Sequence, residues 1–319
     1  MTKTPYVGDL LRGSPSNWGR WGPDDEVGAL NHLTSAEVLR AAAEIRTGEV
    51  FTLQRLIGDE RGDPIWPGRA PAARTQMRDE SHWDAGDPGI PGGCHAADDR
   101  IEMHLQGTTQ CDALGHVWYD GLLYNGYDAR STIGGLDRAS VEPLARRGIV
   151  GRGVLLDLAR FRGAERLGFG AAVTLDELLE CAKSQRTTIE PRDVVVLRTN
   201  FLSLFHEDQE AFARGMREHG EPGLSYSPEL ARWFADMEIP SLVTDTMANE
   251  VTRDPGSGAV LLLHSALMRN LGVVFTEMCD LEAVAARCAT DARFTFCYVA
   301  APLRIARATG SPVNPVVIR

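Results

Sequence analysis

The stretch that decides the fold runs from residue 152 to residue 199 and reads RGVLLDLARFRGAERLGFGAAVTLDELLECAKSQRTTIEPRDVVVLRT. It opens and closes on short apolar runs, at 152–160 and 193–199, which are typical of strands buried in a sheet. Between them, TLDELLECAKSQ predicts a helix that opens on a capping box formed by Thr174 and Glu177. A strand, a helix and a second strand in succession indicate an α/β protein.

The same alternation extends to both sides of this stretch. Helices are predicted at residues 34–46, where Thr34 and Glu37 form a capping box, and at 204–219, 228–237, 265–272 and 280–290. Strands are predicted at residues 49–57, 101–107, 240–244, 259–263, 273–277 and 293–300. No clear linker and no internal repeat interrupts the pattern, so we predict a single domain over residues 1–319.

Residues 58–99 differ from the rest of the chain. They are rich in Gly, Pro, Asp and Arg and show no sustained hydrophobic period, so we expect a long structureless segment. Two roles stay open for it: a plain surface excursion, or a lid or dimer arm.

Composition excludes several classes of function. The 33 Lys and Arg against 44 Asp and Glu give a formal charge of −11, which lacks the basic surface of a nucleic-acid-binding protein and suits anionic membranes poorly. No apolar run reaches 18 residues, the N-terminus has no signal core, and the six cysteines form no CxxC pair. We therefore expect a cytoplasmic protein with reduced thiols, whose partner is a small-molecule substrate rather than nucleic acid or a membrane.

Polar side chains are densest in residues 104–116, HLQGTTQCDALGH. If this segment is extended, period two places four of them on one face: Gln106, Thr108, Gln110 and Asp112. His116 would join that face if a helical turn begins after Asp112. Such a face could hold a divalent cation through a carboxylate, an imidazole and an amide oxygen. The alternative is a polar turn in which Asp112 caps a helix and His116 lies at the surface.

A second group follows much later in the chain. His264 comes directly after the apolar run 259–263, and Glu277 closes the next predicted strand. The carboxyl ends of buried strands are where sites of α/β proteins usually lie. The alternative is a helix-capping histidine and an exposed glutamate.

Four stretches together make the chain recognisable: SNWGRWGPDDEVGALNHLT at 16–34, QGTTQCDALGHVWYDGLLYNG at 106–126, GRGVLLDLARF at 151–161 and HSALMRNLGVVFTEMCDLEAV at 264–284. With them, nearly the whole chain resembles the cyclase-like metal-dependent hydrolases, the family of bacterial kynurenine formamidase and isatin hydrolase. It looks most similar to the longer members named only as cyclase family proteins. The resemblance implies a swivelling β/β/α domain with a β-rich core and outer helices. It also implies a homodimer or homotetramer, to which residues 58–99 could contribute an arm.

The family's signature, HxGTHxDxPxH with a later His and Glu, assigns roles by position. Asp112, His264 and Glu277 match metal ligands, and His116 matches the final histidine of the signature. Gln106 and Gln110 stand where the two earlier histidines would be, and Thr108 replaces the glycine. Because two histidine donors are missing, we expect one divalent ion, Zn²⁺ or Mn²⁺, with Gln110 as a further ligand. The charge of −2 on Asp112 and Glu277 matches one such ion.

The resemblance implies a hydrolase that opens an amide, lactam, lactone or ester bond with a metal-activated water. His116 is the expected general base, and Thr108 or Thr109 could hold the developing oxyanion. Gln106 and His104 are secondary metal candidates. Trp118 and Tyr124 are candidate substrate contacts, for which core packing is the alternative. Two other functions remain open: a metal-dependent lyase or cyclase on the same scaffold, and a catalytically inactive, metal-poor binding protein.

Overall fold

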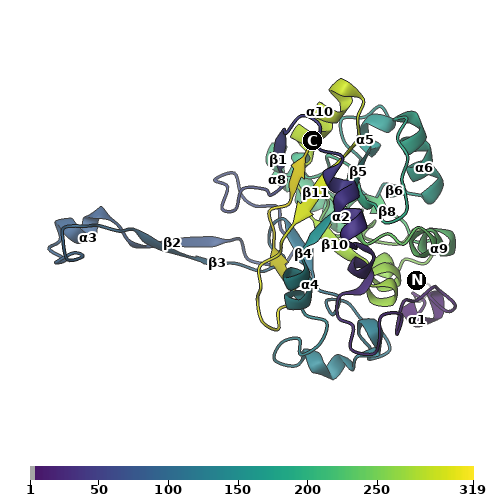
Figure 1. The fold of residues 1–319 in the computed structure, drawn as a ribbon, viewed down its shortest axis with the longest axis horizontal. Coiled ribbons are helices and arrows are strands. Elements are labelled where there is room, and N and C mark those ends of the chain that lie inside the picture. The colour runs from purple at the N-terminus through teal and green to yellow at the C-terminus, as the bar shows by residue number, and fades with distance from the viewer. Residues whose placement is uncertain (1–3) are drawn as a thin grey trace.

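The computed structural model describes residues 4–319, and its central feature is a nine-stranded sheet with helices outside it (Figure 1). The strand order is β1-β13-β11-β5-β7-β9-β10-β4-β12. The four central strands, β5, β7, β9 and β10, run parallel, whereas the pairs beyond them on both sides are antiparallel. This arrangement confirms the predicted α/β class with a β-rich core and outer helices.

The strands of the central sheet are β1 (Val50–Thr52), β4 (Gln110–Asp112), β5 (Ile149–Asp157), β7 (Val194–Arg198), β9 (Ser241–Thr244), β10 (Val274–Glu277), β11 (Thr295–Ala300), β12 (Gly310–Pro312) and β13 (Val316–Ile318). Two small sheets pair β2 (Ala73–Arg78) with β3 (Asp98–Glu102) and β6 (Ala172–Val173) with β8 (Gly223–Leu224). The helices are α1 (Val7–Leu10), α2 (Ser35–Ala42), α3 (Glu80–Asp84), α4 (Val141–Arg147), α5 (Leu158–Phe161), α6 (Leu175–Ser184), α7 (Ser203–Glu207), α8 (Gln209–Glu218), α9 (Pro228–Asp236) and α10 (Glu282–Asp291). Three short 3₁₀ segments, η1 (Gly28–His32), η2 (Tyr124–Gly126) and η3 (Ala129–Thr132), and one π-helical segment, η4 (His264–Leu271), complete the described part of the chain.

Helix starts follow the capping signals closely. In α2, the Thr34 hydroxyl accepts from a backbone N–H and the Glu37 carboxylate accepts from the Thr34 N–H, so the predicted capping box is present. The second predicted box is only half formed. Thr174 caps α6 by accepting from the Glu177 N–H at 3.3 Å, but the Glu177 carboxylate binds Arg162 instead. A charged partner outside the helix therefore replaces the reciprocal hydrogen bond.

Residues 58–99 are not structureless throughout, and in this respect the prediction was wrong. Strands β2 and β3 pair antiparallel, and α3 lies between them near the tip of an arm that projects from the body (Figure 1). All of β3 and most of β2 are exposed on both faces, so neither strand needs the apolar alternation that marks a half-buried strand. The arm was invisible to a pattern search for that reason.

The predicted strand at 259–263 is absent; this run leads instead into η4, whose eight residues are all buried. A short apolar run bounded by turns is compatible with a buried strand or a buried helix. Its length of five residues favours a strand, and this is why the prediction failed here. The predicted stop at Gly272 is confirmed, because this glycine ends η4 with a left-handed φ of 72°. His264 is thus the first residue of a helix rather than the residue after a strand.

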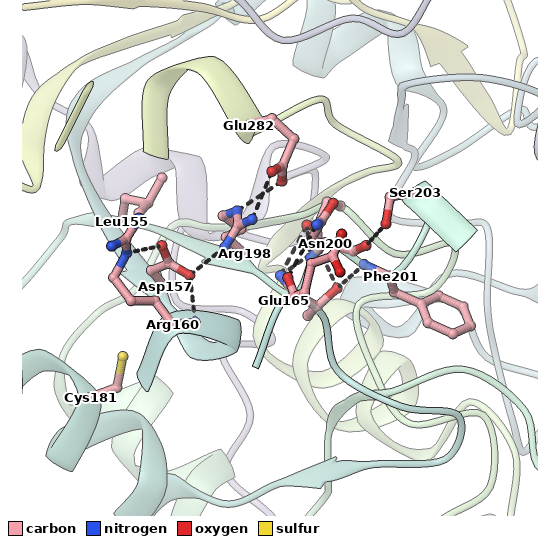
Figure 2. Close-up of polar contacts among 12 residues, drawn as sticks. Leu155, Asp157, Arg160, Glu165, Cys181, Arg198, Asn200, Phe201, Ser203 and Glu282 are labelled. Atoms are coloured by element: carbon pink, nitrogen blue, oxygen red, sulfur yellow. Dashed lines mark hydrogen bonds and ion pairs between the residues drawn. The ribbon is translucent and has the colours of Figure 1, made fainter. Parts of the chain in front are cut away.

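A polar network lies at the carboxyl ends of β5 and β7 (Figure 2). Arg198 donates to Asp157 at 2.7 Å and to both oxygens of Glu282 at 2.8 and 2.7 Å. Asp157 also accepts from the side chain of Arg160 at 3.2 Å. These ion pairs join two neighbouring strands to α10.

In the part of the chain that the structure describes, no helix has the length and apolar character needed to cross a membrane.

Candidate metal centre

The antiparallel pairing of β4 with β10 builds one wall of the candidate site. Gln110 lies opposite Glu277, and Asp112 falls on the same face of β4 because side chains alternate along a strand. Asp112, Glu277 and His264 each offer one ligand atom, and these atoms lie within 4.8 Å of one another. The exposed fraction of the three residues is only 1–2%. Three residues separated by up to 165 positions therefore converge on one buried point, as the sequence predicts.

His264 enters the site from the first turn of η4. Its Nε2 lies 3.4 Å from Glu277 Oε1, and its Nδ1 lies 2.5 Å from Glu250 Oε1. Its ring packs edge-on against Phe275 of β10, with centroids 4.7 Å apart. The ring is thus packed against Phe275 and fixed at Nδ1, while Nε2 faces Glu277.

Gln110 has a defined amide orientation. Its Nε2 donates to Glu277 Oε2 at 2.7 Å, and only the NH₂ end of an amide can approach a carboxylate oxygen that closely. Its Oε1 is consequently buried with no hydrogen-bond partner. The unpaired oxygen leaves Gln110 a candidate ligand.

The site contains several buried oxygens with nothing to bind. Both oxygens of Asp112 and Oε1 of Glu277 lack hydrogen-bond partners in the described chain, like Oε1 of Gln110. Buried carboxylate oxygens are normally paired, because leaving them desolvated and unpaired costs several kcal/mol. One divalent cation would satisfy the unpaired oxygens of Asp112 and Glu277 together with the imidazole, so these residues fit the metal that the family resemblance implies.

Ionisation of these groups reflects the same crowding of negative charge. Burial, reinforced by Asp112, raises the pKa of Glu277 above its usual value. Burial alone would lower the pKa of His264, but the carboxylates of Glu250 and Glu277 outweigh it and raise the pKa to about 10. Both shifts have the same origin, which is the gathering of carboxylates at one buried point.

A further buried acid stands behind the ligands. Glu221 accepts from the Met247 N–H through Oε2 at 2.7 Å, while its Oε1 has no partner. Burial raises its pKa well above the usual range, and Glu277 and Glu250 are near enough to add to that effect. The sequence analysis did not single out Glu221, which lies in no motif.

His116 reaches the site through a tight turn, not through a helical turn. Its N–H donates to the carbonyl of Ala113 at 2.9 Å, directly after β4. Burial lowers the pKa of His116, and the negative charge of Asp112 acts in the opposite direction. It is partly exposed, whereas the ligand residues are buried. His116 is thus near enough to Asp112 to feel its charge, but it is not one of the three residues that offer ligand atoms.

The secondary candidates separate clearly. His104 is exposed near the base of the arm, and the Gln106 side chain donates to Thr309 at 3.1 Å. The Thr109 hydroxyl donates to the Met278 carbonyl at 2.7 Å and accepts from the Arg55 N–H at 2.9 Å, so it is committed to the scaffold. Thr108 is buried next to it in the same turn. Of the two threonines, only Thr108 stays a candidate for holding an oxyanion.

The two aromatic candidates differ in environment. Tyr124 is completely buried and donates its hydroxyl to Asp25 at 2.8 Å, which favours the core-packing alternative. Trp118 is 45% exposed and follows His116 by two residues, so it remains available to a substrate.

The polar network of Figure 2 borders a cavity of about 510 Å³, which is a second candidate position for a binding site. Its carboxylates differ from those of the metal centre because they have partners. Asp245 accepts from Thr199 and Asn200, and Glu282 binds Arg198. The unsatisfied oxygens that call for a cation are at Asp112 and Glu277 instead.

Glu250, like Glu221, lies near the site and has no role that its sequence context indicates. It follows Asn249 in the loop after β9, and no spacing tied it to His264. Its three contacts to residues 263 and 264 depend on the loop and η4 meeting in space. No periodic pattern records such a contact.

Comparison with known proteins places the fold. The model of a family described as "Putative cyclase" matches residues 31–251, more than half of the chain. A crystal structure described as a novel cyclase is 33% identical, with a TM-score of 0.85, covering 96% of this chain and 100% of that one. No functionally curated protein matches the sequence.

More distant solved structures share the fold. Isatin hydrolase A from Labrenzia aggregata has a TM-score of 0.60 at 19% identity, covering 91% of this chain and 98% of its own. A structure described as a potential metal-dependent hydrolase with cyclase activity has a TM-score of 0.51 at 18% identity, covering 85% and 98%. The family model and the 33% identical structure together show that the chain belongs to the cyclase family, with the fold shared by isatin hydrolase.

Proposed function

We propose that this protein is a metal-dependent hydrolase that opens an amide, lactam, lactone or ester bond of a small molecule. The observation that carries the proposal is the convergence of Asp112, His264 and Glu277, with four buried oxygens that lack partners. The names of the related structures, an isatin hydrolase and a potential metal-dependent hydrolase, support the same class of reaction.

The ligand set points to one divalent cation. Asp112 and Glu277 supply two negative charges, His264 a nitrogen and Gln110 an amide oxygen. Three oxygens and one nitrogen suit Zn²⁺ or Mn²⁺, and the replacement of histidines by Gln106 and Gln110 shifts the balance towards oxygen-preferring Mn²⁺. When bound, the cation would lower the pKa of a coordinated water from 15.7 towards about 7 and polarise a substrate carbonyl.

The residues around the cation position divide the remaining tasks. His116 is partly exposed beside Asp112, where it can accept a proton from the attacking water and return it to the leaving group. Because burial lowers the pKa of His116, its neutral form is available at pH 7 to act as a base. Trp118, two residues on, offers an exposed ring to an apolar or aromatic substrate.

Metal analysis and isotope labelling test this function. The purified chain should hold about one equivalent of Zn²⁺ or Mn²⁺, and Asp112→Asn should lose it. With a panel of lactones, lactams and formamides in ¹⁸O-labelled water, the product acid should carry the label. Turnover without label would indicate a lyase or cyclase. Less than one equivalent of metal under replete conditions, with no activity restored by Zn²⁺ or Mn²⁺, would indicate a metal-poor binding protein.

A further inference from the structure

We propose that Glu250 is the positioning residue of the metal centre: its carboxylate sets the ring orientation and tautomer of His264, so that Nε2 faces the cation. The inference deepens the proposed function, because it requires a divalent cation at Asp112, His264 and Glu277. It does not require that any particular substrate be hydrolysed.

The contacts of Glu250 are directed at two successive residues. Oε1 lies 2.5 Å from Nδ1 of His264 and accepts from the His264 backbone N–H at 2.9 Å. Oε2 accepts from the Leu263 N–H at 2.7 Å. An ionised carboxylate can only accept hydrogen bonds, so Nδ1 must carry a hydrogen. When a cation binds, Nε2 is therefore the nitrogen whose lone pair is available, and it is the one that faces Glu277.

The backbone around Glu250 is held in place from the opposite side. Leu224 of β8 donates to the Asn249 carbonyl at 3.2 Å and accepts from the Val251 N–H at 3.0 Å. A Cβ on Gly223 would lie 2.4 Å from the carbonyl carbon of Glu250, so this glycine lets the two segments touch. The carboxylate is thus set in position by the scaffold, which lowers the cost of ordering His264 for a cation.

A purely structural role must be separated from this one. The carboxylate also satisfies two N–H groups at the start of η4, where helix N–H groups have no intrahelical partner. Capping requires only those two contacts. The third contact, to the imidazole, adds nothing to the cap and concerns the ring alone.

The first experiment measures Zn²⁺ affinity by chelator competition. Glu250→Gln keeps the size of the side chain but removes its charge and one acceptor, and we expect 10–100-fold weaker binding. Glu80→Gln is the matched control: Glu80 also lies beside a histidine Nδ1, at 3.3 Å from His95, but on the exposed arm. The control should bind Zn²⁺ like the native chain. Glu250→Asp, which restores the charge, should recover part of the loss.

The second experiment needs no variant. Long-range ¹H–¹⁵N NMR of Zn²⁺-loaded, ¹⁵N-histidine-labelled protein should show His264 with its hydrogen on Nδ1 and the metal at Nε2. A hydrogen on Nε2, or an affinity of Glu250→Gln within twofold of native, overturns the proposal. A native chain that binds Zn²⁺ but hydrolyses nothing overturns only the proposed function. A native chain that binds no Zn²⁺ overturns both.

Discussion

Asp112 and Glu277 present buried oxygens that no group in the described chain satisfies, and the nearby His116 is less buried than they are. In the proposed mechanism, the ligands and the base are therefore different residues with different exposure. A ligand must be shielded and fixed, whereas a base must reach both water and the leaving group. Metal content and turnover should respond separately to changes at the two kinds of position.

His116→Ala provides the test at this scale. We expect turnover to fall by about 10²–10⁴-fold, the usual contribution of a general base, while bound metal stays near the native level. Metal content by mass spectrometry and steady-state kinetics measure the two effects. Loss of the metal together with activity would make His116 a ligand and remove it as the base.

His32 gives a pH-dependent prediction away from the site. Burial lowers its pKa to about 4, against the opposing charge of Glu238. In the unfolded chain, His32 is protonated as the pH falls through about 6.5. In the folded chain it is protonated only near pH 4. The stabilisation that neutral His32 contributes to the folded chain is therefore fully present above pH 6.5, and it declines as the pH falls from 6.5 to 4. Between pH 7 and pH 5, we expect the free energy of unfolding to drop by about 1–2 kcal/mol more in the native chain than in His32→Asn.

Denaturant unfolding at the two pH values measures this difference. His219→Asn, at an exposed histidine, is the control and should keep the native pH dependence. An unchanged pH dependence in His32→Asn would contradict the prediction.

The role of a single residue could be predicted where the residue belongs to a family signature or to a helix cap that is local in sequence. Asp112, His264 and Glu277 were placed together because the signature spans them, and Thr34 because a capping box is local in sequence. Glu250 was not given a role, because its contacts depend on a loop and a helix meeting in space. Thr109 shows the converse: its motif suggested chemistry, but its hydroxyl is used to join β4 to the chain after β10.

Among the elements, η4 is distinctive because distant segments secure both of its ends. Glu250 binds its first turn, and residues 16–18 bind its last carbonyls. The Asn17 N–H and side chain donate to Asn270 and Leu271 at 3.0 and 2.9 Å, and the Trp18 indole donates to Arg269 at 2.8 Å. These donors occupy carbonyls that a helix end leaves free. The SNWG stretch of the sequence thus has a structural role in holding the helix that carries His264.

Gly272 tests the packing at this helix end. Its φ is 72°, and an added Cβ would lie 2.7 Å from both Gly28 Cα and Tyr124 Cε2. Gly258→Ala is a matched control, since Gly258 also has a φ of 72° but has open space around its Cβ position. We expect Gly258→Ala to cost about 1–2 kcal/mol for the backbone conformation, and Gly272→Ala to cost about 1–3 kcal/mol more for the steric conflict. Equal losses in denaturant unfolding would show that the contact relaxes freely.

Strand β2 was missed because nearly every one of its residues is exposed, so it shows no apolar period. The short elements α4, β12 and β13 are also absent from the prediction. By contrast, α2, α6 and α9 carry caps and one apolar face, and their starts were placed within about a residue. Hydrophobic periodicity appears only where an element has one buried and one exposed face, so it cannot reveal a strand that is exposed on both faces.

At the scale of the whole molecule, the arm formed by β2, α3 and β3 has few contacts within one chain that would stabilise it. A two-stranded hairpin is only marginally stable by itself in water. Here Met77 and Ile101 are 52% and 49% exposed, and near the tip Trp83 stacks on His95 and contacts the guanidinium of Arg78. We propose that a second copy of the chain covers the arm in a homodimer, or in a homotetramer built from such dimers.

Replacing residues 75–100 by a short Gly-Ser linker tests this proposal. By light scattering, the native chain should have at least twice the mass of 34.8 kDa, and the armless chain should be a monomer. The metal content of the armless chain is the control for folding, since its ligands all lie in the body. A monomeric native chain, or an armless chain that keeps its oligomeric mass, would contradict the role of the arm.

The pairing of β4 with β10 also bears on how the protein matures. It joins Gln110 to Glu277, so two halves of one binding point are synthesised far apart in time. Asp112 is synthesised well before residues 264 and 277, with which it forms the candidate ligand group. Such long-range pairing is formed late and slowly. The proposed cation can therefore be held by its full ligand set only after residues 264 and 277 have been synthesised.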